Sequence, residues 1–169
     1  MNISKFTQKS VEILNNLEKI AYDFGAQEIA QEHLLYGMLT VEDSLIKKLI
    51  EKMEIDSDVF LAQVEGAVRK RPQVQGGQVY IGQDLNKVLV YAENEAKALG
   101  DEYVSVEHLF LSLLRKPSKE IKQLFHDFQI DRERFLQALS KVRGNQKVTT
   151  DNPEAVYDSL NKYGYDLVE

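Results

Sequence analysis

Apolar residues recur along this chain with the spacing of amphipathic helices. Between positions 83 and 99 they fall at every third or fourth place, which makes one face of a helix apolar. Gly100 follows directly, where the end of a helix favours a residue that tolerates positive φ. The apolar positions are Leu85, Val88, Leu89, Ala92, Ala96 and Leu99. This pattern predicts a helix that ends next to Gly100.

The same pattern occurs twice in the sequence. A shift of 75 positions aligns residues 6–69 with residues 81–144 without a gap, and the phrase Glu-His-Leu then coincides in both copies. Identical residues recur along the whole alignment, which indicates an internal duplication. They include the pairs Leu14/Leu89, Ala21/Ala96, Gly25/Gly100, His33/His108, Ile46/Ile121, Asp56/Asp131 and Phe60/Phe135.

Each copy contains four segments with helical periodicity. In the second copy the second helix is predicted to begin after Ser105, a good N-cap residue, with Glu107 in its first turn. The expected caps of the later helices are Asp43, Ser118, Asp56 and Asp131. We therefore predict an all-α fold of two four-helix units related by pseudo-twofold symmetry. Because each unit buries little alone, the two should share a core within one domain, residues 1–144.

Two segments lie outside the helical pattern. Residues 72–82, PQVQGGQVYIG, contain Pro and three Gly and are predicted to form a loop between the copies. Residues 145–169 are predicted to be a linker with a short helix, with Pro153 at its first position and Gly164 after its end. An apolar stripe on this helix suggests docking onto a further part of a longer protein; it comprises Val156, Tyr157 and Leu160.

Composition excludes several classes of function. The chain has 169 residues with 43% hydrophobic and 28% charged residues, and its formal net charge of -6 predicts no general attraction to nucleic acid or an anionic membrane. The basic run at 69–71 is expected to face the C-terminal dipole of its helix. There is no cysteine and no apolar run of about 18 residues, so we expect a cytoplasmic protein.

No stretch of the sequence matches a phosphate-binding loop, a zinc-protease motif or a nucleophile motif, so no catalytic, metal-binding or cofactor residue is predicted. His33 and His108 recur at one repeat position, each followed four residues later by a small residue, Gly37 or Ser112. We interpret this pattern as a helix–helix contact inside the duplicated domain, because a small residue one turn after the histidine suits a face where another helix comes close. Metal binding is not expected, because the neighbouring glutamates point about 100° away from the histidines on the helix.

Several phrases resemble the N-terminal region of the Clp/Hsp100 ATP-dependent chaperones. They are FTQKSVEIL, EHLLYGML, RPQVQG, GDEYVSVEHLFLSLL and LNKYGYDLVE, and the resemblance covers the whole chain. Within the family the sequence is most similar to the ClpB-type disaggregases. Asp101 after Gly100, and Ser105-Val106 before Glu107, favour this type over the ClpC type.

The resemblance implies a module that performs no chemistry itself. The parent proteins of this family form hexameric rings and hydrolyse ATP, with Mg, in two AAA+ domains that the sequence does not contain. They work with the DnaK system after heat stress and thread aggregated polypeptides through the ring. The isolated fragment is expected to be a monomer that binds unfolded or aggregated polypeptide.

The resemblance also implies candidate substrate-binding residues, namely Thr7, Tyr91, Asp101 and Glu107. Two further groove positions fall on Glu95 and His108, so the groove is expected to be narrower or more polar here. Each candidate also has a structural interpretation: Thr7 as an N-cap, Glu107 beside helix-start N–H groups, Asp101 in a turn. If a binding surface exists, we expect it where the copies differ, at residues 100–103 against residues 25–28.

Two alternatives remain open from the sequence. An adaptor-docking N domain of the ClpC or ClpA type would bind one specific folded partner. A stand-alone helical ligand-binding bundle or enzyme is a third possibility, against which the apolar stripe of the tail argues.

Overall fold

The computed structural model describes residues 3–74, 76–144 and 146–153. The first repeat folds into η1 (Ile3–Lys5), α1 (Gln8–Asn15), α2 (Leu17–Asp23), α3 (Gln31–Thr40), α4 (Leu45–Lys52) and α5 (Ser57–Arg69). The second repeat folds into α6 (Gln83–Ala98), α7 (Val106–Arg115), α8 (Lys119–Asp127) and α9 (Arg132–Arg143). The predicted all-α fold is confirmed. The short helix predicted after Pro153 lies outside the described residues.

The first helix of the first repeat is divided, whereas its counterpart α6 is continuous. The interruption lies at Asn16, whose N–H donates to the Ile13 carbonyl at 3.1 Å, a tighter turn than that of an α-helix. Tyr91 occupies the equivalent position in α6. The interruption in the first repeat thus falls at an asparagine, a residue that favours caps and turns over helix interiors.

Most of the predicted N-caps are confirmed. The Asp56, Ser118 and Asp131 side chains each accept a backbone N–H from the first turn of α5, α8 and α9. The prediction for Asp43 was wrong by one residue: the Ser44 hydroxyl accepts the Lys47 N–H at 3.0 Å and caps α4. Ser44 has the extended backbone that a cap requires, whereas Asp43 has a φ of 56°.

The two repeats exchange short strands around their pseudo-twofold axis. β1 (Glu28–Ile29) of the first repeat pairs in parallel with β2 (Tyr80–Ile81), which leads into α6. The equivalent pairing in the second repeat is an isolated bridge between Phe6 and Val104. In each case the residues just before the first helix of one repeat pair with the loop that precedes the second helix of the other repeat.

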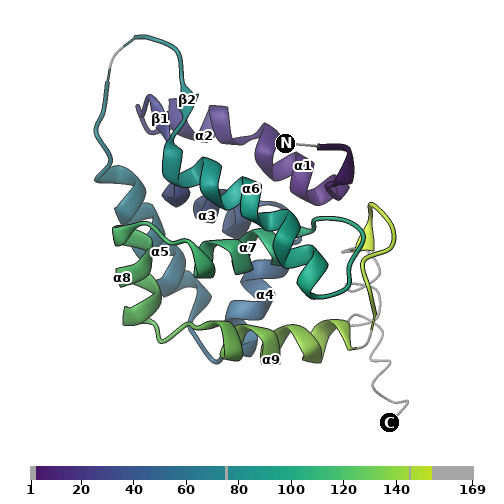
Figure 1. The fold of residues 1–169 in the computed structure, drawn as a ribbon. Coiled ribbons are helices and arrows are strands. Elements are labelled where there is room, and N and C mark those ends of the chain that lie inside the picture. Colours follow the sequence, from purple (N-terminus) through teal and green to yellow (C-terminus); the bar gives the residue numbers. More distant parts are fainter. Residues whose placement is uncertain (1–2, 75, 145, 154–169) are drawn as a thin grey trace.

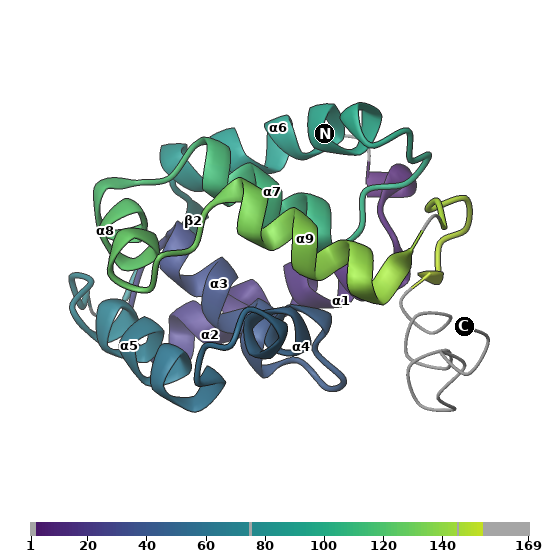
Figure 2. The same ribbon diagram turned by 90° about the horizontal axis from the view of Figure 1, so that it is seen from below.

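The core is continuous across both repeats. Figure 1 shows α3 and α7 in the middle of the molecule, with α1, α2 and α6 on one side and α4, α5, α8 and α9 on the other. Figure 2 shows α9 alongside α7 from below. Phe60 of the first repeat packs edge-on against Phe128 of the second, with ring centroids 5.0 Å apart. One connected cluster of buried side chains includes residues from both copies.

Candidate substrate-binding surface

The histidine of each repeat closes the first turn of its helix. In α7 the backbone N–H of Ser105, the N-cap residue, donates to His108 Nδ1 at 2.8 Å. In α3 the Ala30 N–H donates to His33 Nδ1 at the same distance. Both histidines are fully buried, as the interpretation of a contact inside the domain requires. Their polar partners, however, lie at the helix start and not on a neighbouring helix.

The small residues one turn later mark the close helix contacts. The Ser112 hydroxyl donates to the Val88 carbonyl at 2.6 Å, which joins α7 to α6. A Cβ atom added to Gly37 would lie 3.2 Å from Ile20 Cδ1 and would therefore crowd α2 against α3. The predicted close approach at these positions is thus present in both repeats, with different neighbours.

A buried ionic cluster distinguishes the second repeat. Because His108 Nδ1 accepts a backbone N–H, its proton lies on Nε2, which donates to Asp101 Oδ2 at 2.7 Å. Arg143, at the end of α9, donates to both Asp101 oxygens at 2.6 and 2.9 Å and to Glu107 at 3.2 Å. We call Asp101, Glu107, His108 and Arg143 the buried cluster; each side chain is at least nine-tenths buried.

The electrostatics of the buried cluster favour an ionised Asp101. Burial alone would raise the pKa of this carboxyl, but hydrogen bonds from His108, Arg143 and the Val148 N–H together lower it well below its usual value. The positive charge of Arg143 therefore has two carboxylate partners in a site that excludes water. Removing either Asp101 or Arg143 would leave a buried charge without its main partner.

In the equivalent site of the first repeat, fewer of the buried polar side-chain atoms have hydrogen-bond partners among the described residues. Ala26 and Val68 occupy the places of Asp101 and Arg143, so His33 Nε2 has no hydrogen-bond partner among the described residues. Glu32 is buried, and the nearest guanidinium nitrogen, of Arg71, is 3.7 Å away. Burial therefore raises the pKa of Glu32. Asp101 lies in the stretch 100–103 and its counterpart Ala26 in the stretch 25–28, so the buried cluster distinguishes the two copies within this stretch.

A second polar group joins α6, α7 and α9. Glu95, at a position the family resemblance assigns to the groove, is 1% exposed and lies between Arg115 and Arg132. Burial would raise the pKa of Glu95, but the two guanidinium groups lower it below its usual value. In the first repeat this place belongs to Ile20, a buried apolar residue. The expectation of a narrower or more polar groove at this position stays a prediction.

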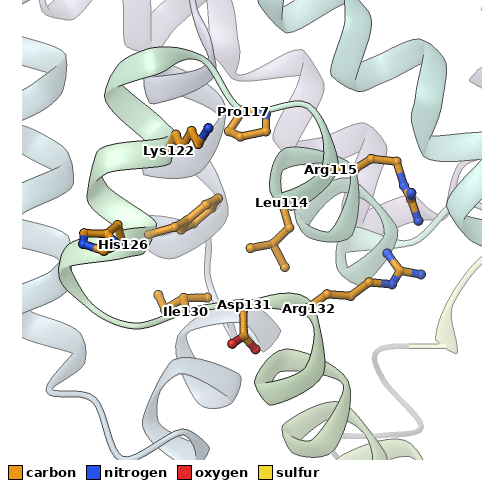
Figure 3. A pocket seen from close by; sticks show the side chains of 9 residues that line it. Leu114, Arg115, Pro117, Lys122, His126, Ile130, Asp131 and Arg132 are labelled. Atoms are coloured by element: carbon orange, nitrogen blue, oxygen red, sulfur yellow. The ribbon is translucent and has the colours of Figure 1, made fainter.

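A hollow of about 480 Å³ lies beside this ion pair, between α7, α8 and α9. Figure 3 shows Leu114 at its centre, with Arg115 and Arg132 together on one side and His126 on the opposite side. The remaining lining residues are Pro117, Lys122, Phe125, Ile130 and Asp131. Leu114, Phe125 and Ile130 make part of its lining apolar, and Arg115, Lys122 and Arg132 place basic groups at its edge.

The four predicted substrate-binding residues do not form one site. Asp101 and Glu107 meet at Arg143, and Thr7 lies nearby because its N–H donates to the Val104 carbonyl at 2.9 Å. These three side chains are buried, and Thr7 caps α1 by accepting the Ser10 N–H. Tyr91 is partly exposed and lies nine residues before Gly100, roughly 13 Å along α6. Its ring carries the Lys116 ammonium 4.6 Å from the centroid.

Arg143 is the member of the buried cluster that sequence reasoning missed. It lies 42 residues from Asp101 and ends a helix, where a basic residue is expected for the helix dipole alone. The sequence does hold one indication of its role: Arg143 aligns with Val68, so the second repeat has a charge where the first has an apolar residue. In the structure Val68 is buried.

Among the described residues no three His, Asp or Glu side chains converge as metal ligands would. The described helices are also too short or too polar for any of them to span a bilayer.

Known proteins match both the sequence and the fold. The family described as "Clp repeat (R) N-terminal domain" matches residues 5–128. "Chaperone protein ClpB" of Nitratidesulfovibrio vulgaris is 42% identical over 100% of this chain, and that of Bacillus cereus (strain ATCC 10987) is 39% identical over 99%. The chain spans about a fifth of the length of these relatives, 20% in both cases.

Solved structures agree with this assignment at the level of the fold. The Hsp104 N-terminal domain from Candida albicans superimposes with a TM-score of 0.78 at 20% identity, over 89% of this chain and 99% of that one. A ClpV N-domain in complex with a VipB peptide gives a TM-score of 0.66 at 20% identity, over 82% and 86%. The resemblance seen in the repeated phrases is therefore confirmed, and the chain belongs to the Clp repeat N-terminal domain family.

Proposed function

We propose that this chain is the N-terminal substrate-engaging module of a ClpB-type protein disaggregase. It binds unfolded or aggregated polypeptide and passes it to a hexameric ring in recovery from heat stress, together with the DnaK system. The observation that carries the proposal is the match of ClpB chaperones over the full length of the chain, at up to 42% identity. ATP and Mg would act in the ATPase domains of the parent protein, in the cytoplasm, and this module would have no ATPase activity.

The surface of the module supports weak and adaptable binding. Aggregated polypeptides share no sequence, so a surface that recognises them must use apolar contacts and main-chain groups. α6 presents Val90, which is 54% exposed, next to the partly exposed Tyr91. The end of α7 beside Tyr91 also forms the edge of the hollow in Figure 3, through Arg115.

The four candidate residues would act in two ways. Tyr91 would contact the polypeptide directly, because its ring reaches the surface. Thr7, Asp101 and Glu107 would support the polar end of the binding surface from beneath, because their buried side chains hold the starts of α1 and α7 in place. The second repeat would therefore carry most of the binding surface.

A direct test measures the binding of a polypeptide that cannot fold, such as a fluorescently labelled, reduced and carboxymethylated protein, by anisotropy. We expect weak, saturable binding, no binding of the same protein in its native form, and no ATP hydrolysis. Tyr91→Ser should weaken binding by about three- to tenfold, as expected for the loss of an aromatic contact. Tyr22→Ser, on α2, is the matched control because Tyr22 is 79% exposed.

Two results would oppose the proposal. A chain that is folded by circular dichroism but binds no unfolded polypeptide would contradict it. Tight capture of one folded protein, with no affinity for unfolded chains, would favour the adaptor-docking alternative of the ClpC or ClpA type. The ClpV N-domain seen with a VipB peptide is a precedent for peptide binding by a domain of this fold.

A further inference from the structure

The chain turns back on itself after α9. Figure 1 shows residues 146–153, in yellow, beside the loop that joins α6 to α7, and Figure 2 shows the same proximity from below. Within this segment, which we call the strap, Val148 is fully buried. Residues 146–152 have no regular secondary structure, yet the strap is hydrogen-bonded to Asp101 and Glu102, in the stretch where the second repeat departs from the first.

The strap is held largely through its main chain. The Glu102 N–H donates to the Val148 carbonyl at 2.8 Å, and the Val148 N–H donates to Asp101 Oδ1 at 3.0 Å. Further along, the Gln8 N–H donates to the Asp151 carbonyl at 2.7 Å. The strap is thus bound as an extended peptide is bound in a groove, by main-chain hydrogen bonds with a buried apolar side chain between them.

The groups that hold the strap belong to the buried cluster and its surroundings. Asp101 accepts from Val148 while it also binds Arg143 and His108. Arg143 in turn donates to the Gln146 carbonyl at 2.9 Å. When the strap leaves, these groups and the N–H groups of Gln8 and Glu102 become donors and acceptors for another main chain.

We propose that the strap occupies a polypeptide-binding groove, in the place that a segment of substrate takes when it binds. An extended segment of an unfolded polypeptide takes its place, with an apolar side chain in the site of Val148 and its main chain on Glu102, Asp101 and Gln8. Such recognition requires one apolar residue and no defined sequence, which suits aggregated substrates. This inference rests on the proposed function and adds that binding competes with the chain's own strap.

A disulfide that locks the strap tests the competition. The Gln8 N–H donates to the Asp151 carbonyl at 2.7 Å, and this main-chain hydrogen bond keeps the two Cα atoms within the separation that a disulfide spans. The chain has no cysteine, so Gln8→Cys with Asp151→Cys would form one defined bond. The oxidised protein should bind the unfolded polypeptide at least about tenfold more weakly than the same sample after reduction. Gln8→Cys alone should not respond to reduction.

The opposite change should release the strap. Val148→Asp places a charge in a fully buried apolar site, so we expect tighter polypeptide binding and faster hydrogen exchange at the amides of Gln8 and Glu102. Val74→Asp is the matched control, because Val74 lies in the corresponding stretch of the connector and is 46% exposed. It should change neither the affinity nor the exchange of these amides.

The two proposals fail in different ways. If the unaltered chain binds no unfolded polypeptide, the proposed function is contradicted. If it does bind, but the oxidised and reduced forms of the double-cysteine variant bind equally and both melt as folded proteins, the polypeptide does not enter the site of the strap. That result would overturn this inference and leave the proposed function intact.

Discussion

At the scale of the residue, the duplicated histidine has one structural role and two surroundings. In both repeats its Nδ1 accepts the N-cap N–H, which explains why it recurs at one position. Among the described residues, Nε2 has a hydrogen-bond partner in the second repeat, Asp101, and none in the first. The difference follows from a few substitutions between the copies, including Ala26 to Asp101 and Val68 to Arg143.

A charge placed at His108 should destabilise the fold. His108→Asp would remove the N-cap acceptor geometry and put a second carboxylate beside Asp101 in a buried site, at a cost of about 3–5 kcal/mol. His126→Asp is the matched control, because His126 is exposed on α8 and the same change there should cost less than about 1 kcal/mol. Urea unfolding followed by circular dichroism measures both. Equal stability of the two variants would rule out a structural role for the buried cluster.

The first-repeat histidine predicts a dependence of stability on pH. Burial, and then the charge of Arg71, lower the pKa of His33 from 6.5 to about 4. Between these pH values His33 is protonated in the unfolded chain and neutral in the folded chain. The free energy of unfolding therefore falls as pH falls from 6.5 to about 4, by roughly 3 kcal/mol in total. Above pH 6.5 this contribution is constant.

The variant His33→Gln isolates that contribution. Glutamine at this helix position can still accept the N-cap N–H, but it does not titrate. Other groups, such as Glu32 with its raised pKa, contribute to the pH profile of both proteins, so the difference between the two profiles belongs to His33. Urea unfolding at a series of pH values should show that the unaltered chain loses stability relative to His33→Gln as pH falls from 6.5 to about 4. Parallel profiles would mean that His33 does not titrate on unfolding in this range.

At the scale of the element, the two copies share several helix ends, whereas some of their N-caps differ, as at Ser44 and Ser118. Gly25 and Gly100 both end their helices with φ near 70°, at 72° and 73°. Glu54 and Gln129 end α4 and α8 with positive φ as well, although neither is glycine. Local geometry is thus shared even where the sequence is not identical.

Two glycines within helices offer a matched comparison of helix contacts. Gly66→Ala in α5 should stabilise the fold by about 1 kcal/mol, because a Cβ there meets nothing within 4 Å and alanine favours a helix. Gly37→Ala in α3 should gain less or lose stability, because the new Cβ lies 3.2 Å from Ile20 Cδ1. Thermal denaturation of both variants tests this. An equal gain at both positions would show that α2 and α3 are not in close contact.

Helical periodicity predicted the helices and most caps, because these depend on neighbours within a few residues. The break at Asn16 and the cap at Ser44 depend on finer local conformation, and the pattern missed them. The buried cluster joins groups separated by up to 42 residues, so no local pattern could reveal it. Polar composition made the strap look like a plain linker, although it contains a fully buried valine.

At the scale of the whole molecule, one glutamine joins the repeats at the centre of the fold. The Gln31 side chain donates to the carbonyls of Asp84 and Lys116, both at 2.9 Å, and accepts the Ser118 N–H at 2.8 Å. Val106 is its counterpart and can make none of these bonds. The exchanged strands and the continuous core connect the same two units, so we expect them to unfold as one.

Gln31→Val should therefore weaken the whole molecule, at a cost of about 1–3 kcal/mol for the groups left without partners. Gln63→Val is the control, because Gln63 is exposed on α5. Hydrogen exchange of the slowest amides should accelerate equally in α3 and α7. Acceleration confined to the first repeat would contradict a single cooperative unit.

The central claim is that unfolded polypeptide binds at the strap end of the second repeat, and amide chemical shifts measure this directly. When the ¹⁵N-labelled chain is titrated with an unfolded polypeptide, the amides of Gln8, Glu102 and Val148 should shift saturably, because they bond to or within the strap. The equivalent amides of Gln83 and Gln27 should stay in place. A folded chain with no saturable shift, or with equal shifts at both sets of positions, would contradict the account.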